Sequence, residues 1–393
     1  MRPLAKTMHR RTTPTLLALA AAAAALVPAA RAGAIPDVPA GYWAEAAIEY
    51  VAEDRSWMRD FGLDEFRPEA KLRRRHLARA VVLAFAATEE PDPAISFVDV
   101  PEDNTFYPFA NVAVKEGWMV AKGGRFRPLD RVTKRELDRA LVKALGLDLE
   151  VSGLNGIRTA AGYAFERPMG FAFLVLAQEL GLHHNHGTTA EHRELLPSSK
   201  VRRADGAYAL WKADLARGTW KISALAKYRD IEVGKMGPAR RQAAEFALDH
   251  AGYPYVWAGE WDGKTPTGYC CGAQAQGGFD CSGFAWWVLR EPGGGWDNTA
   301  VRPYEGWPLP ERSSKDMAKA TPEHLTYEET KPMDLMFFDG DGGSGWAGVD
   351  HAALYLGKGW AIDSSNSRDG VSVVWVKDGW YRDHFVWSRA VIG

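Results

Sequence analysis

The 393-residue chain has few cysteines, little net charge and almost no long apolar run. Three cysteines are too few for a small disulfide scaffold, and a formal net charge of −2 gives no basic field that would attract nucleic acid. Hydrophobic residues make up 46% of the chain and charged residues 25%, which excludes a disordered chain. The composition is typical of a globular protein, and the length predicts two or three domains.

The first 32 residues have the layout of a secretory signal peptide. Four cations precede an apolar run over 16–27, and a small-x-small cleavage site follows at Ala30-Arg31-Ala32. This run is shorter than the ~20 apolar residues that a membrane-spanning helix needs, and no later segment is long enough. We therefore expect an exported protein with no membrane contact after cleavage; an uncleaved anchor is the alternative.

A repeat of about 60 residues follows. The repeated pieces are D-V-P at 37–39 and 99–101, F-R-P at 66–68 and 126–128, and a helical pattern at 72–86, 132–146 and 200–213. One such unit cannot bury its own apolar face, so we expect three units to pack together as an all-α region. The expected copies are 33–90, 91–150 and a degenerate third copy, 151–215, which lacks D-V-P and F-x-P.

These motifs resemble the S-layer homology module. A cation stands at the family's arginine position in each copy, as Arg74, Lys134 and Arg203. The resemblance implies that these cations meet an anionic secondary cell-wall polysaccharide at a groove between repeats, and a guanidinium suits carboxylate or ketal acids. The alternative is that they form a solvated helix face or helix caps. Whether the third copy completes the binding unit stays open.

Three further segments carry simpler expectations. Residues 216–236 should be a linker that packs as a strand or two. The cluster His183-His184-Asn185-His186 has no ligand partner at metal-binding spacing, so we expect a surface loop there. The sequence DGDGGSG at 339–345 lacks the residues of a calcium loop and predicts a turn.

The C-terminal region, 237–393, alternates helical and strand patterns. A helix is expected over 238–251, and a second begins at Cys281, where Asp280 or Ser282 can cap it. Apolar runs separated by glycine-rich turns predict strands at 334–338, 351–357, 360–363 and 371–376. Helices followed by a small antiparallel sheet make an α+β domain.

Cys281 is the candidate nucleophile, and its thiol would need a lowered pKa to react. A free thiol has a pKa of about 8.5 and a histidine-paired one about 3–4, a difference of roughly 7 kcal/mol. A helix N-terminus supplies only about 0.3–2 kcal/mol, so a nearby imidazole must supply most of it. His351 opens a strand and is the best candidate, and Asp363 on the next strand would orient its ring.

These pieces resemble the bacterial cell-wall cysteine endopeptidases of the NlpC type. The family's motifs have counterparts, in order, in G-Y-P-Y-V-W-A-G, D-C-S-G-F, P-M-D-L-M-F-F and H-A-A-L-Y-L-G. The resemblance implies a papain-like α+β peptidase domain over 237–393, with nucleophile Cys281, base His351 and ring-orienting Asp363. It implies hydrolysis of an amide in peptidoglycan stem peptides, typically between γ-D-glutamate and a diamino acid. No cofactor or metal is expected.

The same resemblance implies a set of substrate-binding residues. Tyr255 would lie beside the nucleophile and help to hold the oxyanion, with Trp257 nearby. Asp280 and Ser282 stand where family members hold the free amine of a stem peptide. Together with the repeats, this predicts a secreted, cell-wall-associated protein.

The chain also departs from the family pattern. Ala258 and Met333 replace glycines, and Asp363 stands where the family usually has histidine. Cys270 and Cys271, in a long insert at 260–278, would bond to each other, or one of them would bond Cys281 and switch the enzyme off.

Two other classes of function therefore remain as alternatives. One is a non-catalytic wall-binding or scaffold protein with an inactive peptidase-like domain. The other is an amidase or acyl-transfer enzyme on the same scaffold.

Overall fold

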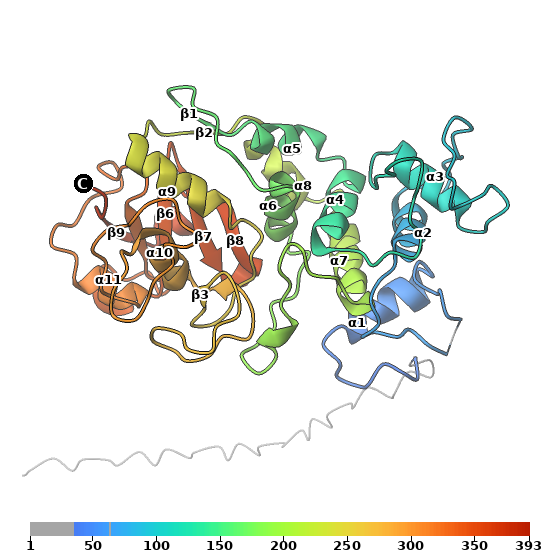
Figure 1. The fold of residues 1–393 in the computed structure, drawn as a ribbon, viewed down its shortest axis with the longest axis horizontal. Helices are drawn as coiled ribbons and strands as arrows, with labels where there is room; N and C mark the ends of the chain where they lie inside the picture. The colour runs from blue at the N-terminus through green and yellow to red at the C-terminus, as the bar shows by residue number, and fades with distance from the viewer. Residues whose placement is uncertain (1–34, 63) are drawn as a thin grey trace, which may run out of the picture. The chain divides into compact units, whose positions relative to one another are not determined.

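The structure, a computed structural model, describes residues 35–393 except Leu63, so the expected signal peptide lies outside the described residues. The first part of the described chain is helical (Figure 1). Its elements are α1 (Glu45–Ile48), η1 (Glu49–Asp54), α2 (Arg74–Phe85), α3 (Tyr107–Lys115), α4 (Lys134–Ala144), α5 (Asp148–Asn155), β1 (Arg158–Thr159), α6 (Phe171–Glu179), η2 (Glu191–Arg193) and α7 (Arg203–Ala216).

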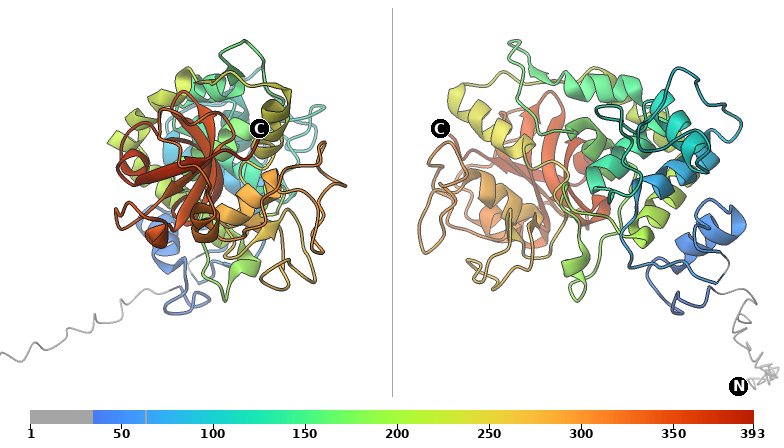
Figure 2. Two further views of the ribbon diagram at one scale, coloured as in Figure 1. Left: turned by 90° about the vertical axis from the view of Figure 1, so that its left-hand side faces the viewer. Right: turned by 45° about the vertical axis from the view of Figure 1, so that its right-hand side comes forward.

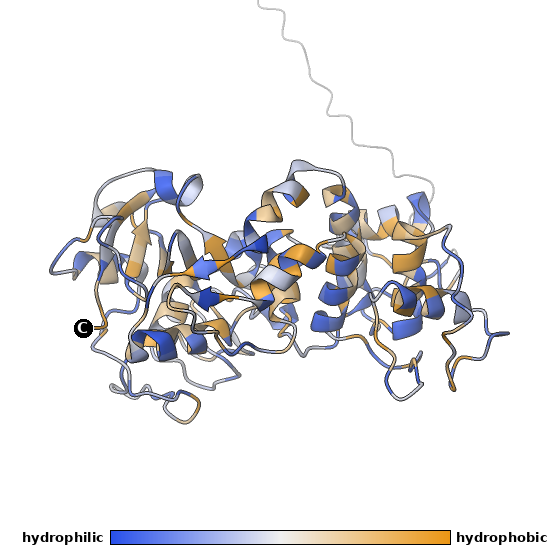
Figure 3. Ribbon diagram, turned by 90° about the horizontal axis from the view of Figure 1, so that it is seen from above, coloured by the Kyte–Doolittle hydropathy of each residue, from blue (hydrophilic) through white to orange (hydrophobic). Residues whose placement is uncertain are grey.

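The helices pair between repeats. α2 packs on α3, α4 packs on α6, and α7 packs on α1, so each pair joins two of the expected copies. α2 and α4 each carry an apolar stripe that these contacts bury, and Figure 3 shows the mixture of apolar and polar residues along the helices. The apolar residues of the three segments therefore share one buried core.

A closed ring of three backbone hydrogen bonds joins the copies just before α2, α4 and α7. Leu72 donates to Val201 at 3.1 Å, Val201 donates to Val132 at 3.0 Å, and Val132 donates to Leu72 at 2.9 Å. Each of the three residues donates to one neighbour and accepts from the other. All three side chains are buried, so the ring lies in a dry environment where backbone groups need partners.

The recurring D-V-P and F-R-P motifs meet in space. Both carboxylate oxygens of Asp37 accept backbone N–H groups, from Phe66 at 2.8 Å and from Arg67 at 2.6 Å. Asp99 does the same for the second copy, where it accepts from Phe126 and Arg127 at 2.9 Å each. The repeated aspartate thus holds the repeated loop.

The third copy has a counterpart of the F-R-P loop that the sequence pattern missed. The backbone N–H of Arg135 donates to the carbonyl of Pro197 at 3.2 Å. In the same way Arg75 donates to Pro128 at 3.0 Å, and Ala204 donates to Pro68 at 3.1 Å. Pro197, in Leu-Leu-Pro, therefore takes the place of the motif proline, and its carbonyl makes the same backbone contact as those of Pro68 and Pro128.

The three cations expected to bind a polymer are buried, with at most 4% of each residue exposed. The guanidinium of Arg203 donates to the carbonyls of Phe66 and Met58 and forms a 2.6 Å ion pair with Asp60. These partners belong to the first copy, so Arg203 ties the third copy to it.

Arg74 and Lys134 are held in a similar way. Arg74 donates to two carbonyls of the second copy and pairs with Glu136 at 3.0 Å. Lys134 pairs with Asp138 at 3.3 Å, and Asp138 contacts His183 of the third copy at 2.7 Å. The expectation that these cations meet a polysaccharide directly is therefore corrected, because their polar groups are used inside the protein.

The expectation that the histidine cluster forms a surface loop is also wrong, because this segment packs into the protein. His183 and His186 are buried, and the ring of His184 stacks on Trp43 at a centroid distance of 4.9 Å. Among residues 35–393, Leu63 excepted, no group of histidine, cysteine and carboxylate side chains is arranged to hold a metal ion.

The expected linker is mostly helical. It contains α8 (Trp220–Ala224), η3 (Leu225–Arg229) and β2 (Glu232–Val233), and β2 pairs in parallel with β1. The hydroxyl of Tyr228 donates to the carbonyl of Val373 at 2.7 Å, so the segment packs against the C-terminal sheet. The expectation of a strand or two is correct only for β2, because Leu225 and Tyr228 are spaced to bury one face of a helical turn.

The C-terminal part combines helices with a five-stranded antiparallel sheet, as expected. Its helical elements are α9 (Pro238–Leu248), α10 (Cys281–Leu289), α11 (Ser314–Lys319), η4 (Trp346–Gly348), η5 (Asn366–Arg368) and α12 (Trp380–Asp383). Its strands are β3 (Glu260–Trp261), β4 (Gly278–Phe279), β5 (Leu335–Phe338), β6 (His351–Gly357), β7 (Trp360–Ser365), β8 (Gly370–Trp375) and β9 (Phe385–Arg389), and the order in the main sheet is β8-β7-β6-β5-β9.

Two helices connect this sheet to the rest of the described chain. α10 packs against β6 and β7, which brings its N-terminus to the sheet (Figures 1 and 2). α6 is buried along almost its whole length, because it packs against α4 and α5 and also against β8. The helices of the described residues include none with the length and apolar character needed to cross a membrane.

Candidate active site

Cys281 is the first residue of α10, and the local sequence explains how it comes to be there. The side chain of Asp280 accepts a hydrogen bond from the backbone N–H of Gly283 at 2.5 Å and so caps the helix. Only glycine fits at position 283, because a Cβ there would lie 1.9 Å from the carbonyl oxygen of Gly259. The cap and the close approach together fix the start of the helix and the position of the sulfur.

The sulfur of Cys281 is free. Cys270 and Cys271 form a disulfide with each other, so the option in which one of them blocks Cys281 does not occur. Cys281 is 8% exposed, and its Sγ lies 3.8 Å from the carbonyl oxygen of Asp350. That carbonyl belongs to the residue before His351, so the sulfur lies at the start of β6.

His351 and Asp363 lie on the adjacent strands β6 and β7. The ring Nε2 of His351 contacts Oδ2 of Asp363 at 2.7 Å, which leaves Nδ1 as the ring nitrogen for Cys281. Burial opposes a charge on the ring, but hydrogen bonds to Asp363 and Cys281 outweigh it and raise the pKa of His351 to about 10. The ring of His351 therefore carries a positive charge beside the sulfur.

Asp363 has partners that the sequence did not reveal. Its side chain is fully buried, and its Oδ2 also accepts a hydrogen bond from the hydroxyl of Tyr381 at 2.5 Å. Burial opposes the charge on this carboxylate too, yet the bond to His351 and the nearby charges hold the pKa of Asp363 below its usual value. Tyr381 lies on α12 in no recognisable motif, so only its contact in space identifies it.

Asp280 and Ser282 are held in a different way from the expected one. Arg312 forms two 3.1 Å contacts with the carboxylate of Asp280 and donates to the hydroxyl of Ser282 at 2.9 Å. Arg312 also pairs with Glu260 at 2.8 Å. The expectation that Asp280 and Ser282 hold a free amine stays a prediction; in the structure the Asp280 carboxylate caps α10 and shares Arg312 with Glu260.

Tyr255 lies beside the nucleophile, where the sequence placed it. Burial raises the pKa of its hydroxyl, and the charges of Cys281 and Asp280 raise it further. The hydroxyl is therefore a donor at all ordinary pH values. Trp380, which the sequence did not single out, is 45% exposed, and its ring centroid lies 6.2 Å from that of His351.

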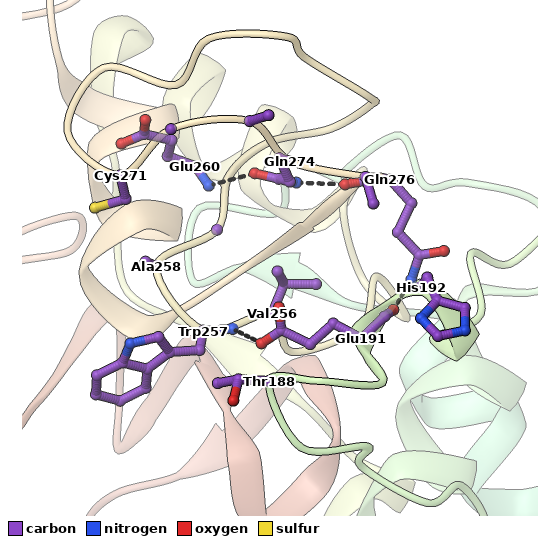
Figure 4. A pocket seen from close by; sticks show the side chains of 14 residues that line it. Thr188, Glu191, His192, Val256, Trp257, Ala258, Glu260, Cys271, Gln274 and Gln276 are labelled. Carbon is purple, nitrogen blue, oxygen red and sulfur yellow. Dashed lines mark hydrogen bonds between the residues drawn. The ribbon is translucent and has the colours of Figure 1, made fainter.

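A cavity of about 260 Å³ lies between residues 256–276 of the C-terminal part and the loop that carries η2 (Figure 4). Glu191 of η2 accepts a hydrogen bond from the backbone N–H of Trp257 at 2.8 Å, and the side chain of Gln276 donates to the carbonyl of Glu191 at 2.8 Å. Trp257 is 66% exposed at this cavity. The helical part of the chain thus contributes one wall of it.

The two replaced glycines keep the backbone geometry that glycine would favour. Ala258 has φ of 59° and Met333 has φ of 68°, both in the left-handed region. That conformation costs an L-residue roughly 1–2 kcal/mol relative to an ordinary one. Met333 is completely buried, so its side-chain packing offsets this cost, whereas Ala258 has only a methyl group to bury.

Comparison with known proteins assigns the C-terminal region to a family. Residues 252–390 match the sequence profile of the NlpC/P60 family. The chain is 27% identical over 219 residues to an S-layer protein of Bacillus thuringiensis subsp. finitimus, which covers 55% of this chain and 26% of that protein. It is 29% identical over 140 residues to the bifunctional muramidase/DL-endopeptidase CwlT of Bacillus subtilis, which covers 36% of this chain and 33% of that protein.

A solved structure of an NlpC/P60 family protein from Bacillus cereus is 24% identical, covers 40% of this chain and 42% of that chain, and superposes with a TM-score of 0.30. The chain spans about a quarter to a third of the length of the two curated relatives. Residues 252–390 form an NlpC/P60 domain, and the α+β fold with its small antiparallel sheet is the one expected for it. The similarity to the S-layer protein is distant, and the S-layer homology modules remain a prediction.

Proposed function

We propose that the protein is an exported cell-wall hydrolase that cleaves an amide bond in peptidoglycan stem peptides. The observation that carries the proposal is the arrangement of a free cysteine at a helix N-terminus with a histidine and a buried carboxylate on two adjacent strands. This arrangement supplies a nucleophile, a proton carrier and a group that orients the carrier.

In the proposed reaction the thiolate of Cys281 attacks the carbonyl carbon of the amide. The oxyanion faces the positive end of α10 and the hydroxyl of Tyr255. As the C–N bond breaks, Nδ1 of His351 gives its proton to the leaving amine, and a thioester remains on Cys281. Water then attacks the thioester and gives a proton back to His351, which releases the acid and restores the thiolate. Asp363 stays ionised throughout and holds Nε2.

The proposed bond is the one between γ-D-glutamate and the diamino acid. The relative CwlT is named as a DL-endopeptidase, and the motifs around Cys281 and His351 are of the type that the NlpC resemblance attaches to this bond. Tyr255 and Trp257 would contact the peptide on the side of the 260 Å³ cavity.

The test is digestion of purified muropeptides by the mature protein, with mass spectrometry of the new amino termini. We expect one new terminus on the diamino acid, and none with the Cys281→Ala variant. A cut between sugar and peptide would assign an amidase instead, and a product joined to an added amine would assign acyl transfer.

We also propose that the helical repeats attach the enzyme to an anionic wall polysaccharide, through other residues than those first expected. A cavity of about 550 Å³ between the first two copies is lined by five cationic side chains outside the buried set. They are Arg67, Lys71, Arg73, Arg75 and Arg131. Arg73 and Arg131 are exposed, and no side-chain partner holds either of them within the described residues.

We expect the double variant Arg73→Ala/Arg131→Ala to bind purified cell walls at least about fivefold more weakly at low salt, because exposed charges act mainly through screened attraction. The assay is sedimentation with walls, in a Cys281→Ala background so that the walls stay intact. Arg125→Ala, an exposed cation away from this cavity, is the matched control. Undiminished binding to walls stripped of secondary polymers would contradict the polysaccharide as partner.

A further inference from the structure

Glu179, the last residue of α6, lies outside the NlpC/P60 domain but pairs with a residue inside it. Its Oε1 lies 2.6 Å from Nε of Arg368, which ends η5. The side chain of Glu179 is 9% exposed, and the other cation near it, Lys227, is more distant at 3.8 Å. A buried carboxylate needs a cation close by, and Arg368 is the nearer of the two cations beside Glu179.

Arg368 connects this ion pair to the catalytic centre. Its Nη1 donates to the hydroxyl oxygen of Tyr381 at 2.8 Å. The hydroxyl of Tyr381 in turn lies 2.5 Å from Oδ2 of Asp363, which contacts His351. Four consecutive contacts thus run from a helix of the N-terminal part to the imidazole.

The chemistry of these groups fixes the direction of each hydrogen bond between Arg368 and His351. A guanidinium has only donors, so the oxygen of Tyr381 accepts from Arg368 and its own hydrogen must point to Asp363. Asp363 then receives a donor from Tyr381 and a second donor from Nε2 of His351 on the same oxygen. This keeps the carboxylate as an acceptor and keeps the proton of the neutral ring on Nε2, so that Nδ1 faces the sulfur.

We infer that Glu179 is a positioning residue for the catalytic centre, acting through Arg368 and Tyr381 on Asp363. The inference rests on the thiol mechanism proposed above, and it extends the catalytic unit beyond the family domain to a helix of the preceding region. Glu179 positions the guanidinium of Arg368, and this guanidinium orients the hydroxyl of Tyr381. The hydroxyl in turn holds the carboxylate of Asp363 against the ring of His351.

Charge provides the first test of this inference. Arg368 is a cation whose charge acts on Asp363, and Glu179 is an anion one contact further from the catalytic centre. The other ionisable groups that face this line are Cys281 on α10, Tyr228 and Lys227 on η3, and the residues already named. Removing the cation and removing the anion should therefore have opposite electrostatic effects.

The experiment measures how the rate of iodoacetamide labelling of Cys281 depends on pH in the full chain. We expect Arg368→Met to raise the pH at which labelling is half its plateau by about half a unit, and Glu179→Gln to lower it by a similar amount. Arg382→Met and Glu328→Gln are the matched controls, because they break an exposed ion pair next to Tyr381 and should move the midpoint by much less. Midpoints that move in the same direction, or no more than in the controls, would overturn the inference.

Tyr381→Phe keeps the test decisive if a charge variant does not fold, because it removes one oxygen and no charge. We expect this variant to lower kcat on muropeptides about tenfold with KM and the labelling midpoint unchanged. An unchanged kcat would overturn the inference. Because labelling needs no substrate, a failure of the proposed peptide substrate leaves the labelling result intact, so the two failures are distinguishable.

Discussion

Replacing Cys281 with alanine should reduce muropeptide hydrolysis by roughly 10⁴-fold or more, because no other group near His351 can form the thioester. The variant should fold normally, since the replacement removes a single sulfur atom from the first residue of α10. Turnover of a defined muropeptide, followed by chromatography, measures the loss. The double variant Cys270→Ser/Cys271→Ser is the control, because it removes the two other sulfurs and leaves the nucleophile in place.

His351 should be needed for the reactivity of the same sulfur. The raised pKa of His351, about 10, means that the ring stays protonated across the neutral range and loses its proton only as the pH rises towards 10. We therefore expect fast iodoacetamide labelling of Cys281 at pH 6 and slow labelling in His351→Ala. Slow labelling of both proteins would favour the alternative of an inactive, wall-binding scaffold.

The second large effect concerns stability. Arg203→Met should lower the free energy of unfolding by about 3 kcal/mol, because it leaves Asp60 buried without its closest cation and orphans two carbonyls. Arg79, at 3.2 Å from Asp60, remains and keeps the loss from being larger. Urea unfolding followed by circular dichroism measures the change.

Arg131→Met is the matched control for this prediction. Arg131 is exposed, so its replacement should change the free energy of unfolding by less than about 0.5 kcal/mol. If Arg203→Met proved as stable as the wild type, Arg203 would not be a structural cation, and direct contact with a polymer would again be the better explanation of its place in the repeat.

The strands and helices of the NlpC/P60 domain were predictable because each has a local signal. Apolar runs between glycine turns predicted β6 at its observed bounds, and β7 and β8 to within a few residues. The sequence placed Cys281 at a helix N-terminus because Asp280 is a good cap. It also singled out His351 and Asp363, which the structure brings together.

The partners of charged residues were not predictable in the same way. Arg312 pairs with Asp280 from 32 residues away, and Arg203 pairs with Asp60 from 143 residues away. No periodicity marks such pairs, since they depend on how separate elements pack. A cation at a repeated position therefore suggested a binding surface, whereas in the structure it joins the copies.

The ring formed by Leu72, Val132 and Val201 has a consequence for how this architecture can vary. In a solenoid, an open end leaves donors and acceptors to which a further unit can be added. Here each of the three residues uses its one backbone donor and its backbone carbonyl on the other two, and the ring is closed. Adding or removing a repeat would break this ring of hydrogen bonds. The backbone geometry therefore favours three repeats.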